Sequence, residues 1–447
     1  MSSFGSLASV TRRGFLRTTF ATIGASVLAA SIPACSSIPL VGRKQKMQIW
    51  TDATFAPPSD DYQTAEIQNW AKSKGVEIEV TRSPGGDNQK KLQASIEAKK
   101  LPDIAQVDTG RFTQFQPSNI FVDVSDLFKE FGQQWNGFFK PAEQVVTVEG
   151  KQWALPYSID TSLILSRLDF LKKANVTSAP KTWDELFATA KEAMQPPDYY
   201  GTGIQLNKAG TDADNTFTMM MYGFGASLVK DDSQTLNINT PEMEAFLEYA
   251  LKTWQMGVYP PGVTGWDNNS NNTALQDGKV VYIHNPASPL VWARQNRPDL
   301  LPSLGVVATP AGPKGQFNSA YLRDGFAVMK TGNNDSTELS RDLMRHLYSK
   351  EVYTKWIELA FPAPAVQGLS DLEIWKNPQR GPFLDAARTG VLDGYPGRPT
   401  PALGALGNQV PVLGMVIRVI VDKWSPKQAI DELVKIAEPI YAKYYKK

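Results

Sequence analysis

The chain of 447 residues contains a single cysteine, Cys35, and only two histidines, His284 and His346. One cysteine excludes a disulfide framework and a site built from several thiolates. Two histidines exclude a histidine-rich zinc site, and a Ser-His-Asp triad would have to use one of them. The sequence has no Gly-x-Ser-x-Gly segment to supply the nucleophile of such a triad. We therefore expect neither a bound metal nor a cofactor.

A strong excess of charge is also missing. The formal net charge is +1, from 46 basic and 45 acidic side chains, whereas nucleic-acid binding requires a basic stripe. Apolar runs after residue 40 are short, so we expect no later segment to span a bilayer. The length and the hydrophobic fraction of 42% are sufficient for a large core and predict two lobes.

The N-terminal segment has the layout of an export signal. Residues 1–34 contain three arginines and no acid, and residues 18–34 are uncharged and mostly apolar or small. The pair Arg12-Arg13, closely followed by Phe15, resembles a twin-arginine signal. We predict a signal peptide over residues 1–34; the alternative is an ordinary basic tail.

The only cysteine stands at the end of this segment. Ile32-Pro33-Ala34-Cys35 resembles a lipoprotein-processing box, in which Cys35 becomes the acylated N-terminus and residues 35–45 form a lipid-anchored tether. Pro33 departs from the pattern and leaves open plain cleavage at a nearby alanine. A buried, unmodified Cys35 is a further possibility. The expected location is the periplasmic or cell-surface side of the cytoplasmic membrane.

Strand and helix signals alternate after residue 46, which predicts an α/β fold with a mainly parallel sheet covered by helices. Thr182-x-x-Glu185 is a capping box that opens a helix over residues 182–194. Thr240-Pro241 and Ser425-Pro426 open two further helices. Three polar or Pro/Gly-rich stretches are expected to be turns or loops: 268–272, 309–317 and 390–407.

Two motifs carry a resemblance to a known family. Gly150-Lys-Gln-Trp-Ala-Leu-Pro-Tyr157 and Pro180-Lys-Thr-Trp-Asp-Glu-Leu186 resemble segments of the bacterial extracellular solute-binding proteins of the maltose-binding-protein type. Further similar segments follow in the family's order, and the resemblance covers about residues 46–445: Lys46–Trp50, Leu101–Ile104, Leu275–Tyr282, Pro310–Gly315 and Asp422–Ala429.

The resemblance implies a periplasmic-binding-protein fold of two lobes with a hinge and an interlobe ligand cleft. Lobe one would comprise residues 46–158 and 306–365, and lobe two residues 159–305 and 366–447. The ligand would lie at the carboxyl ends of strands, and the lobes would close on it. The implied function is a monomeric, non-enzymatic lipoprotein that captures a carbohydrate in the interlobe cleft, either a di- or oligosaccharide or a sugar-polyol, and delivers it to the membrane permease of an ABC importer.

A sugar site needs carboxylates and amides for its hydroxyls and aromatic rings for its C–H faces. The resemblance implies sugar contacts at Arg111 and Asp160, and more loosely at Asn215 and Phe217. Other candidates follow expected strand ends or stand outside apolar stripes. The complete candidate set is Asp52, Thr54, Asp108, Arg111, Tyr157, Asp160, Asn215, Phe217, Trp266, Asn285, Tyr321, Arg323 and Asp324.

Several candidates have a second interpretation. Asp160 could form a hinge salt bridge, and Arg323 and Asp324 could pair with each other there. Tyr157 could be a ring platform or a core residue. Trp266 stands in the polar segment Gly265-Trp-Asp-Asn-Asn, outside any apolar stripe, which favours a ligand role over a core role.

Three further functions compete with sugar capture. A binding protein for a phosphorylated or charged solute, such as a glycerol-phosphate compound, could use Arg111 and Arg323. Iron could use Tyr199-Tyr200, although Tyr200-Gly201 matches a strand entrance of the family. A secreted glycosidase would need two carboxylates at a defined separation, which Asp52, Asp108 or Asp160 could supply.

Overall fold

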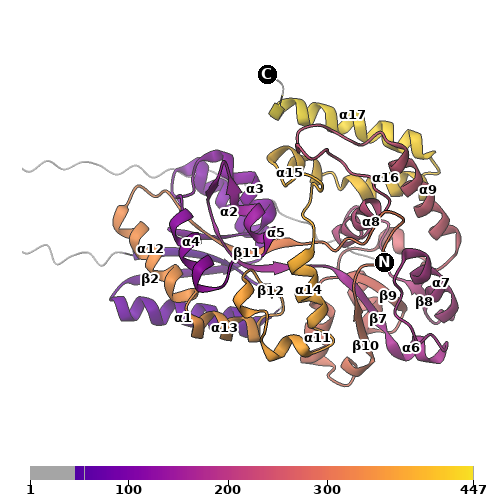
Figure 1. Ribbon diagram of the computed structural model, residues 1–447, viewed down its shortest axis with the longest axis horizontal. Helices are drawn as coiled ribbons and strands as arrows, with labels where there is room; N and C mark the ends of the chain where they lie inside the picture. Colours follow the sequence, from indigo (N-terminus) through magenta and orange to yellow (C-terminus); the bar gives the residue numbers. More distant parts are fainter. Residues whose placement is uncertain (1–45, 55, 446–447) are drawn as a thin grey trace, which may run out of the picture. The chain divides into compact units, whose positions relative to one another are not determined.

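The computed structural model describes residues 46–54 and 56–445. The predicted signal peptide, Cys35 and the tether lie outside the described residues. Two sheets organise the described chain, and helices cover them (Figure 1). A third, two-stranded ribbon consists of β4 (Thr147–Val148) and β5 (Lys151–Gln152).

The first sheet has six strands in the order β12-β6-β11-β3-β1-β2. Its β1 (Lys46–Asp52), β2 (Glu77–Ser83) and β3 (Ile104–Val107) pair in parallel, joined by the crossover helices α1 (Pro57–Lys74) and α2 (Gly85–Ala98). The other strands add antiparallel pairs: β6 (Leu155–Asp160), β11 (Tyr321–Val328) and β12 (Ala363–Pro364). The expectation of a mainly parallel sheet is therefore wrong beyond β3, because later returns of the chain insert strands in the opposite direction.

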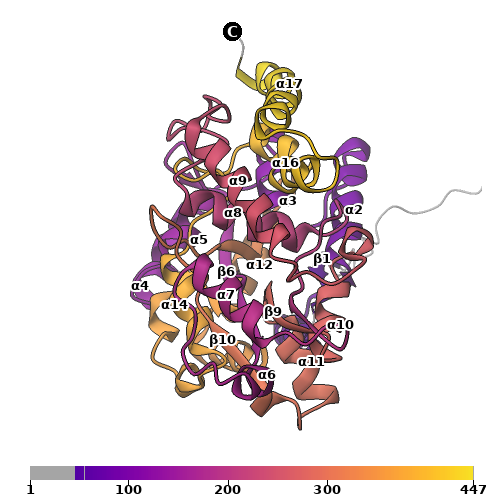
Figure 2. The same ribbon diagram turned by 90° about the vertical axis from the view of Figure 1, so that its right-hand side faces the viewer.

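The second sheet has four strands in the order β10-β7-β9-β8; Figure 2 labels two of them, β9 and β10. They are β7 (Leu163–Arg167), β8 (Tyr200–Thr202), β9 (Val280–Asn285) and β10 (Leu304–Val307). Only β8 and β9 pair in parallel, because β7 and β10 both run antiparallel to their neighbours. Every residue of β7 and β9 is buried, so these two strands are covered on both faces.

Helices follow the strands along the whole described chain, with five short 3₁₀ turns between them. The remaining α-helices are α3 (Thr109–Phe115), α4 (Ser125–Gln134), α5 (Lys140–Val146), α6 (Leu168–Lys173), α7 (Trp183–Ala193), α8 (Thr211–Gly223), α9 (Pro241–Gln255), α10 (Ser270–Gln276), α11 (Ser288–Asn296), α12 (Asn334–Leu347), α13 (Lys350–Leu359), α14 (Gly381–Thr389), α15 (Pro401–Gly407), α16 (Pro411–Ile420) and α17 (Pro426–Tyr445).

The helix starts follow the sequence signals. The Thr182 side chain accepts a hydrogen bond of 3.2 Å from the Glu185 amide and caps α7. The Glu185 carboxylate accepts from the Lys181 amide at 2.6 Å rather than from Thr182, so the capping box is shifted by one residue. Thr240 caps α9 in the same way, accepting from the Met243 amide at 3.2 Å.

Two expected turns contain helices. Thr400 accepts a hydrogen bond of 3.2 Å from the Leu403 amide and opens α15 inside the expected loop 390–407. The polar segment 268–272 leads directly into α10. In the segment 390–407 a helix begins at the Thr400-Pro401 start signal despite the glycines, because the apolar face of α15 is buried against the helices around it.

One described stretch, Pro401–Ile420, is long and apolar enough to cross a membrane by length and composition, contrary to the expectation from the sequence. The stretch covers two separate helices, α15 and α16. Of its apolar 18-residue segment, 56% is buried inside the protein. Its side chains belong to the core of the second half, together with those of α7, α8, α9 and α17.

Chain segments after residue 365 do not all pack around the second sheet. Leu369, Trp375, Leu384 and Leu392 lie in the core that surrounds the six-stranded sheet. The side chains of Phe361 and Phe383 join a further core cluster with β7, β9 and α11. The segment 366–392, assigned from the resemblance to lobe two, therefore packs largely against the first sheet, and the residue bounds of the two lobes stay a prediction.

Candidate functional site

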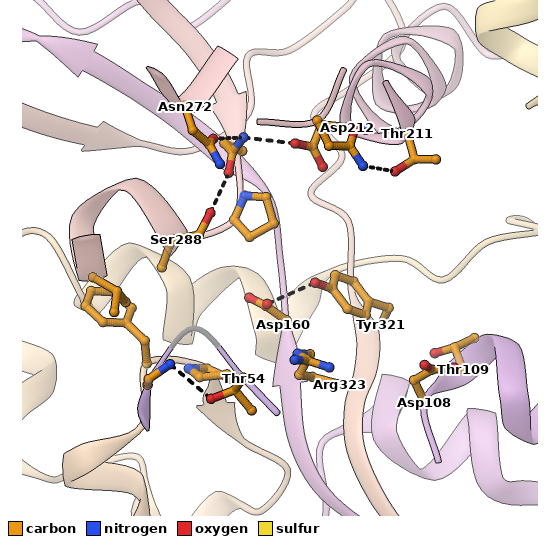
Figure 3. A pocket seen from close by; sticks show the side chains of 18 of the residues that line it. Thr54, Asp108, Thr109, Asp160, Thr211, Asp212, Asn272, Ser288, Tyr321 and Arg323 are labelled. Atoms are coloured by element: carbon orange, nitrogen blue, oxygen red, sulfur yellow. Dashed lines mark hydrogen bonds between the residues drawn. The ribbon is translucent and has the colours of Figure 1, made fainter. Parts of the chain in front are cut away.

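A cavity of about 670 Å³ lies where strands of both sheets end (Figure 3). We call it the main cavity. Its first wall follows β1, β3 and β6 at their carboxyl ends, and its second wall follows β9 and the first turn of α8. This position agrees with the general rule that open α/β sheets bind ligands beyond the carboxyl ends of strands. The lining side chains that carry the argument below are Thr54, Asp108, Thr109, Asp160, Thr211, Asp212, Asn268, Asn269, Asn272, Asn285, Ser288, Tyr321, Arg323, Phe361 and Asp393.

The loops after β1 and β3 fix the first wall by local hydrogen bonds. Thr54 donates its hydroxyl to Asp60 at 2.7 Å, so its side chain is already engaged. Asp108 caps α3, because its Oδ1 accepts a hydrogen bond of 2.8 Å from the Arg111 amide. One third of the Asp108 side chain remains exposed, which leaves it able to meet a ligand.

Asp160, Tyr321 and Arg323 come from adjacent strands. Tyr321 stands opposite Asp160 in the β11–β6 pairing and donates its phenol to Oδ2 of Asp160 at 2.9 Å. Burial raises the pKa of Asp160, and the nearby Arg323 cation opposes this shift. Asp160 has no ion pair within 4.0 Å among the described residues, so the structure does not place it in a hinge salt bridge.

Arg323 is the only basic side chain that lines the main cavity within the described residues. Its nearest carboxylate oxygen is Oδ2 of Asp52, at 3.9 Å, and 19% of its side chain is exposed. Its guanidinium makes no hydrogen bond to the described residues. Because a guanidinium has five N–H donors, Arg323 presents free donors to the cavity. It does not pair with Asp324, which instead accepts from Ser158 at 2.5 Å and from Gln106 at 3.1 Å.

Amides organise the second wall around one carboxylate. Oδ2 of Asp212 accepts from Asn285 at 3.0 Å and from Asn271 at 3.3 Å. Asn285 also donates to Asn272 at 2.7 Å and accepts from Ser288 at 3.2 Å. Burial raises the pKa of Asp212 to about 6, with the amide hydrogen bonds opposing the shift. No cation neutralises this carboxylate within 4.0 Å among the described side chains.

Arg111 is buried rather than cavity-lining. Only 2% of its side chain is exposed, and it lies between Asp52 and Asp108. It donates to Oδ1 of Asp52 at 2.7 Å and to Oδ2 of Asp108 at 3.0 Å, and it also contacts Oδ2 of Asp52. The Asp52 backbone amide is held by Gln106 at 2.6 Å. Asp52 and Arg111 therefore form a support beneath the first wall.

The remaining candidates lie elsewhere. Tyr157 is fully buried, stacks on Tyr353 with ring centroids 4.3 Å apart and donates to the Leu347 carbonyl, which fits the core interpretation. Phe217 is fully buried in the second core. Trp266 packs against two core clusters and lines a separate, shallow depression.

Asn215 also lies outside the main cavity and lines a neighbouring cavity of about 350 Å³. Among the sequence candidates, the structure thus brings together Thr54, Asp108, Asp160, Asn285, Tyr321 and Arg323.

Sequence reasoning missed several lining residues. Asp212 is three positions before the candidate Asn215. Asn268, Asn269 and Asn272 belong to the polar stretch that was expected to form a turn. Phe361 and Asp393 follow no strand signal, so nothing in the local pattern marks them. Among the described residues, Tyr321 and Phe361 are the aromatic side chains that line the cavity, and no tryptophan lines it.

Within residues 46–54 and 56–445, no group of three or more His, Cys, Asp and Glu side chains is arranged to hold a metal ion. The buried His284 lies between Thr216 and Thr309, at 3.1 and 3.2 Å from its ring nitrogens. Burial lowers its pKa to about 3, so it stays neutral and serves the packing of β9.

Known proteins share this sequence pattern and fold. A probable ABC transporter-binding protein of Deinococcus radiodurans is 25% identical over 377 residues, which are 81% of this chain and 86% of the relative. The arabinooligosaccharide-binding protein of Bacillus subtilis is 21% identical over 344 residues, or 75% of this chain and 77% of the relative. An ABC transporter solute-binding protein of Thermotoga lettingae, solved with α-D-tagatose, has a TM-score of 0.74 at 20% identity, covering 89% of this chain and all of that one.

The two-lobe solute-binding fold implied by the sequence resemblance is confirmed by this structural similarity. Residues 65–382 match the family described as bacterial extracellular solute-binding protein. That match covers well over half of the chain and includes strands from both sheets and both walls of the main cavity. The chain belongs to the bacterial extracellular solute-binding proteins, a family of exported binding proteins.

Proposed function

We propose that this chain captures a neutral carbohydrate in the main cavity and delivers it to the membrane permease of an ABC importer. The observation that carries the proposal is the chemistry of the cavity lining. Carboxylates, side-chain amides and hydroxyls surround a space of about 670 Å³, within the range of about 300–1,000 Å³ usual for small-molecule sites. Such a lining matches a ligand with many hydroxyl groups, because each carboxylate accepts and each amide both donates and accepts.

Each wall offers a different part of sugar recognition. Arg323 has free donors beside the acceptor Asp160, a combination that suits two neighbouring hydroxyls of one ring. Asp108 and Asp212 offer further acceptors from opposite walls. Tyr321 and Phe361 supply the aromatic surface against which C–H faces can pack.

The charges favour a neutral ligand over an anionic one. Four carboxylates line the main cavity, those of Asp108, Asp160, Asp212 and Asp393, against the single cation of Arg323. Arg111, one of the two arginines that capture of a phosphorylated solute could use, is buried and already held by Asp52 and Asp108. A phosphate ester would therefore meet more negative than positive charge.

Iron capture and glycoside hydrolysis receive less support. Tyr199, one of the two tyrosines that could bind iron, is 6% exposed and stacks on Phe170 with centroids 4.0 Å apart, away from the main cavity. A glycosidase would use two carboxylates as acid and base; of the three candidates, Asp52 is committed to Arg111, and Asp108 and Asp160 line the main cavity. The family consists of binding proteins. The similar protein of Bacillus subtilis is named an arabinooligosaccharide-binding protein, and that of Thermotoga lettingae was solved with α-D-tagatose.

The test is a thermal-shift screen of the purified protein against neutral sugars, polyols and phosphate esters. A ligand at one hundred times its dissociation constant stabilises the folded state by about 2.7 kcal/mol. We expect a neutral sugar or polyol to give such a shift and phosphate esters to give none. A shift with phosphate esters alone would replace sugar capture by capture of an anionic solute.

We further propose that the chain is exported by the twin-arginine route and anchored through an acylated Cys35. The basic pair Arg12-Arg13 before an apolar segment, and the position of the only cysteine at its end, support this. Replacing Arg12-Arg13 by Lys-Lys should block export. Cys35→Ala should move the exported protein from the membrane to the soluble fraction; continued membrane attachment would contradict the anchor.

A further inference from the structure

The ring of Phe361 reaches the main cavity from the junction between α13 and β12. Its backbone belongs to the part of the chain that returns to the six-stranded sheet, because β12 is a strand of that sheet. Its side chain instead packs in the core cluster of β7, β9 and α11, with Phe383 of α14 edge-on at a centroid distance of 6.1 Å. The orientation of the Phe361 ring therefore depends on contacts from both parts of the fold.

One of the groups beside this ring, Arg380, is a buried cation that is held without a carboxylate. Only 3% of Arg380 is exposed, and its guanidinium hydrogen-bonds to backbone carbonyls alone among the residues that the structure describes. Burial lowers the pKa of Arg380 to about 10, and the neighbouring Arg294 cation acts in the same direction. Arg380 thus stays charged at neutral pH, and a buried charge without an opposite charge is costly unless other groups compensate it.

Two kinds of contact compensate this charge. The guanidinium donates to the carbonyls of Ile357 at 3.1 Å, Ala360 at 2.9 Å and Glu358 at 3.4 Å. These carbonyls end α13, where a helix leaves its acceptors unpaired and favours a cation. The guanidinium carbon also lies 5.1 Å from the ring centroid of Phe361 and 5.0 Å from that of Trp375, within the range of cation–π attraction. One side chain therefore fixes both the last turn of α13 and the ring that follows it.

The backbone that carries Arg380 is anchored to the other sheet. The side chain of Gln379 donates to the carbonyls of Leu301 at 2.7 Å and Leu304 at 2.8 Å, at the start of β10. Since Gln379 is tied to the four-stranded sheet and Arg380 to the end of α13, the two neighbours connect both parts of the fold. They do so where the Phe361 ring enters the lining of the main cavity.

We propose that Arg380 is a positioning residue of the ligand site. Arg380 does not line the main cavity; it holds the Phe361 ring in the orientation in which the ring covers a C–H face of the bound sugar. Arg380 therefore contributes to affinity through Phe361 and through no contact of its own with the ligand. The inference rests on the proposed function, because it names the group that orients the aromatic part of that site.

A role in the stability of α13 alone is the alternative, and a double-mutant cycle separates the two roles. The variants are Arg380→Gln, which keeps amide donors and removes the cation, Phe361→Leu, which removes the ring, and the double variant. The matched control is Arg294→Gln. It removes the other cation beside this ring, 5.4 Å from the centroid, but Arg294 is exposed.

Calorimetry with the best neutral sugar of the screen measures affinity, and thermal melting shows that each variant folds. We expect Arg380→Gln and Phe361→Leu each to weaken binding by about fivefold to tenfold. The double variant should bind within about twofold of Phe361→Leu, because two residues that act through one contact are not additive. Arg294→Gln should bind within about twofold of wild type, since an exposed cation–π contact is weak.

Two results of the cycle would overturn the inference. One is unchanged sugar affinity of folded Arg380→Gln. The other is a loss caused by Arg380→Gln that persists in full when Phe361 is already leucine, because Arg380 would then act by another route. In both cases the wild-type protein still binds sugar, so the proposed function stands. If no sugar binds the wild-type protein, the proposed function fails and the inference fails with it.

A second measurement decides the question even if Arg380→Gln does not fold. In protein labelled with fluorophenylalanine, the fluorine NMR signal that is absent from Phe361→Leu reports the Phe361 ring. We expect the sugar to move this signal in the wild-type protein, because the ring contacts the ligand. A signal that stays in place while calorimetry shows sugar binding would mean that Arg380 orients no ligand contact, and the inference would be wrong.

Discussion

The phenol of Tyr321 donates a hydrogen bond of 2.9 Å to the carboxylate of Asp160 across paired positions of β11 and β6. Asp160 is the last residue of β6, immediately before the chain passes to β7 in the second sheet, and Tyr321 is the first residue of the neighbouring strand β11. Both line the main cavity (Figure 3). The hydrogen bond therefore fixes a cavity carboxylate at the point where the chain crosses between the sheets.

Tyr321→Phe should weaken ligand binding while keeping the ring. Loss of the hydroxyl removes a donor to a buried carboxylate, which costs about 1.5–3 kcal/mol for hydrogen bonds to charged groups. We expect Asp160 to become less well oriented and sugar affinity to fall by about tenfold, measured by calorimetry at pH 7. Because the Tyr321 phenol also lowers the pKa of Asp160, the loss should be larger at pH 5. Equal affinity of variant and wild type at both values would contradict a ligand role for this pair.

Arg111→Met should act on stability. The substitution leaves Asp52 buried without its cation, and removal of one partner of a buried pair costs about 3–5 kcal/mol. Urea unfolding measures this loss. The control is Arg297→Met, which removes an exposed pair with Asp299 and should cost less than about 1 kcal/mol. Similar losses for both variants would mean that the Asp52–Arg111 contact is not a buried support.

Arg111 illustrates which part of the site was accessible from sequence. Its position after a strand end was predicted correctly, but its contact with Asp52 was not predicted. Whether its guanidinium faces the ligand or another side chain depends on which carboxylates fold back onto it. The pair of Asp52 and Arg111 joins residues 59 positions apart, so no local sequence pattern indicates it. Arg323, with the same chemistry, has its free donors in the main cavity instead.

Trp266→Ala should also lower stability and spare binding. The ring packs against two core clusters, although the sequence around it is polar and favoured a ligand role. Removing a buried aromatic ring costs about 3–5 kcal/mol, and the partial exposure of Trp266 reduces our expectation to about 2–3 kcal/mol. Urea unfolding and sugar titration on the same variant separate the effects. Reduced affinity with unchanged stability would restore the ligand role.

Asp212→Asn should change the pH dependence of stability. Burial raises the pKa of Asp212 to about 6, whereas an aspartate in an unfolded chain titrates near about 3.9. Between these values the folded protein holds a proton that the unfolded chain has released, so the free energy of unfolding falls as pH rises. The variant lacks this contribution. Relative to wild type, it should therefore gain about 1–2 kcal/mol between pH 4 and pH 7.

Urea unfolding at both pH values measures this difference. Asparagine keeps an oxygen that can accept from Asn271 and Asn285, so the amide network around position 212 can persist. A constant difference between variant and wild type across this pH range would mean that Asp212 ionises as an ordinary exposed carboxylate.

The fold was largely predictable because its signals are local. Alternation of strands and helices over residues 46–107, the Thr182 cap and the Pro241 start each depend on a few neighbouring residues. The direction of later strands was not predictable in this way, since β11 inserts between β3 and β6 from more than 150 positions away. Phe361 was missed for the same reason: its place beside the main cavity results from packing with α11 and α14, not from a local pattern.

The central claim, that a sugar is bound in the main cavity, is tested most directly by blocking that cavity. Gly86 lines it, and a Cβ atom built there meets nothing within 4 Å. We predict that the wild-type protein and Gly86→Ala bind the best neutral sugar of the screen with equal affinity in calorimetry. Gly86→Trp should melt as wild type and lose at least a hundredfold in affinity. Undiminished sugar binding by folded Gly86→Trp would contradict the account.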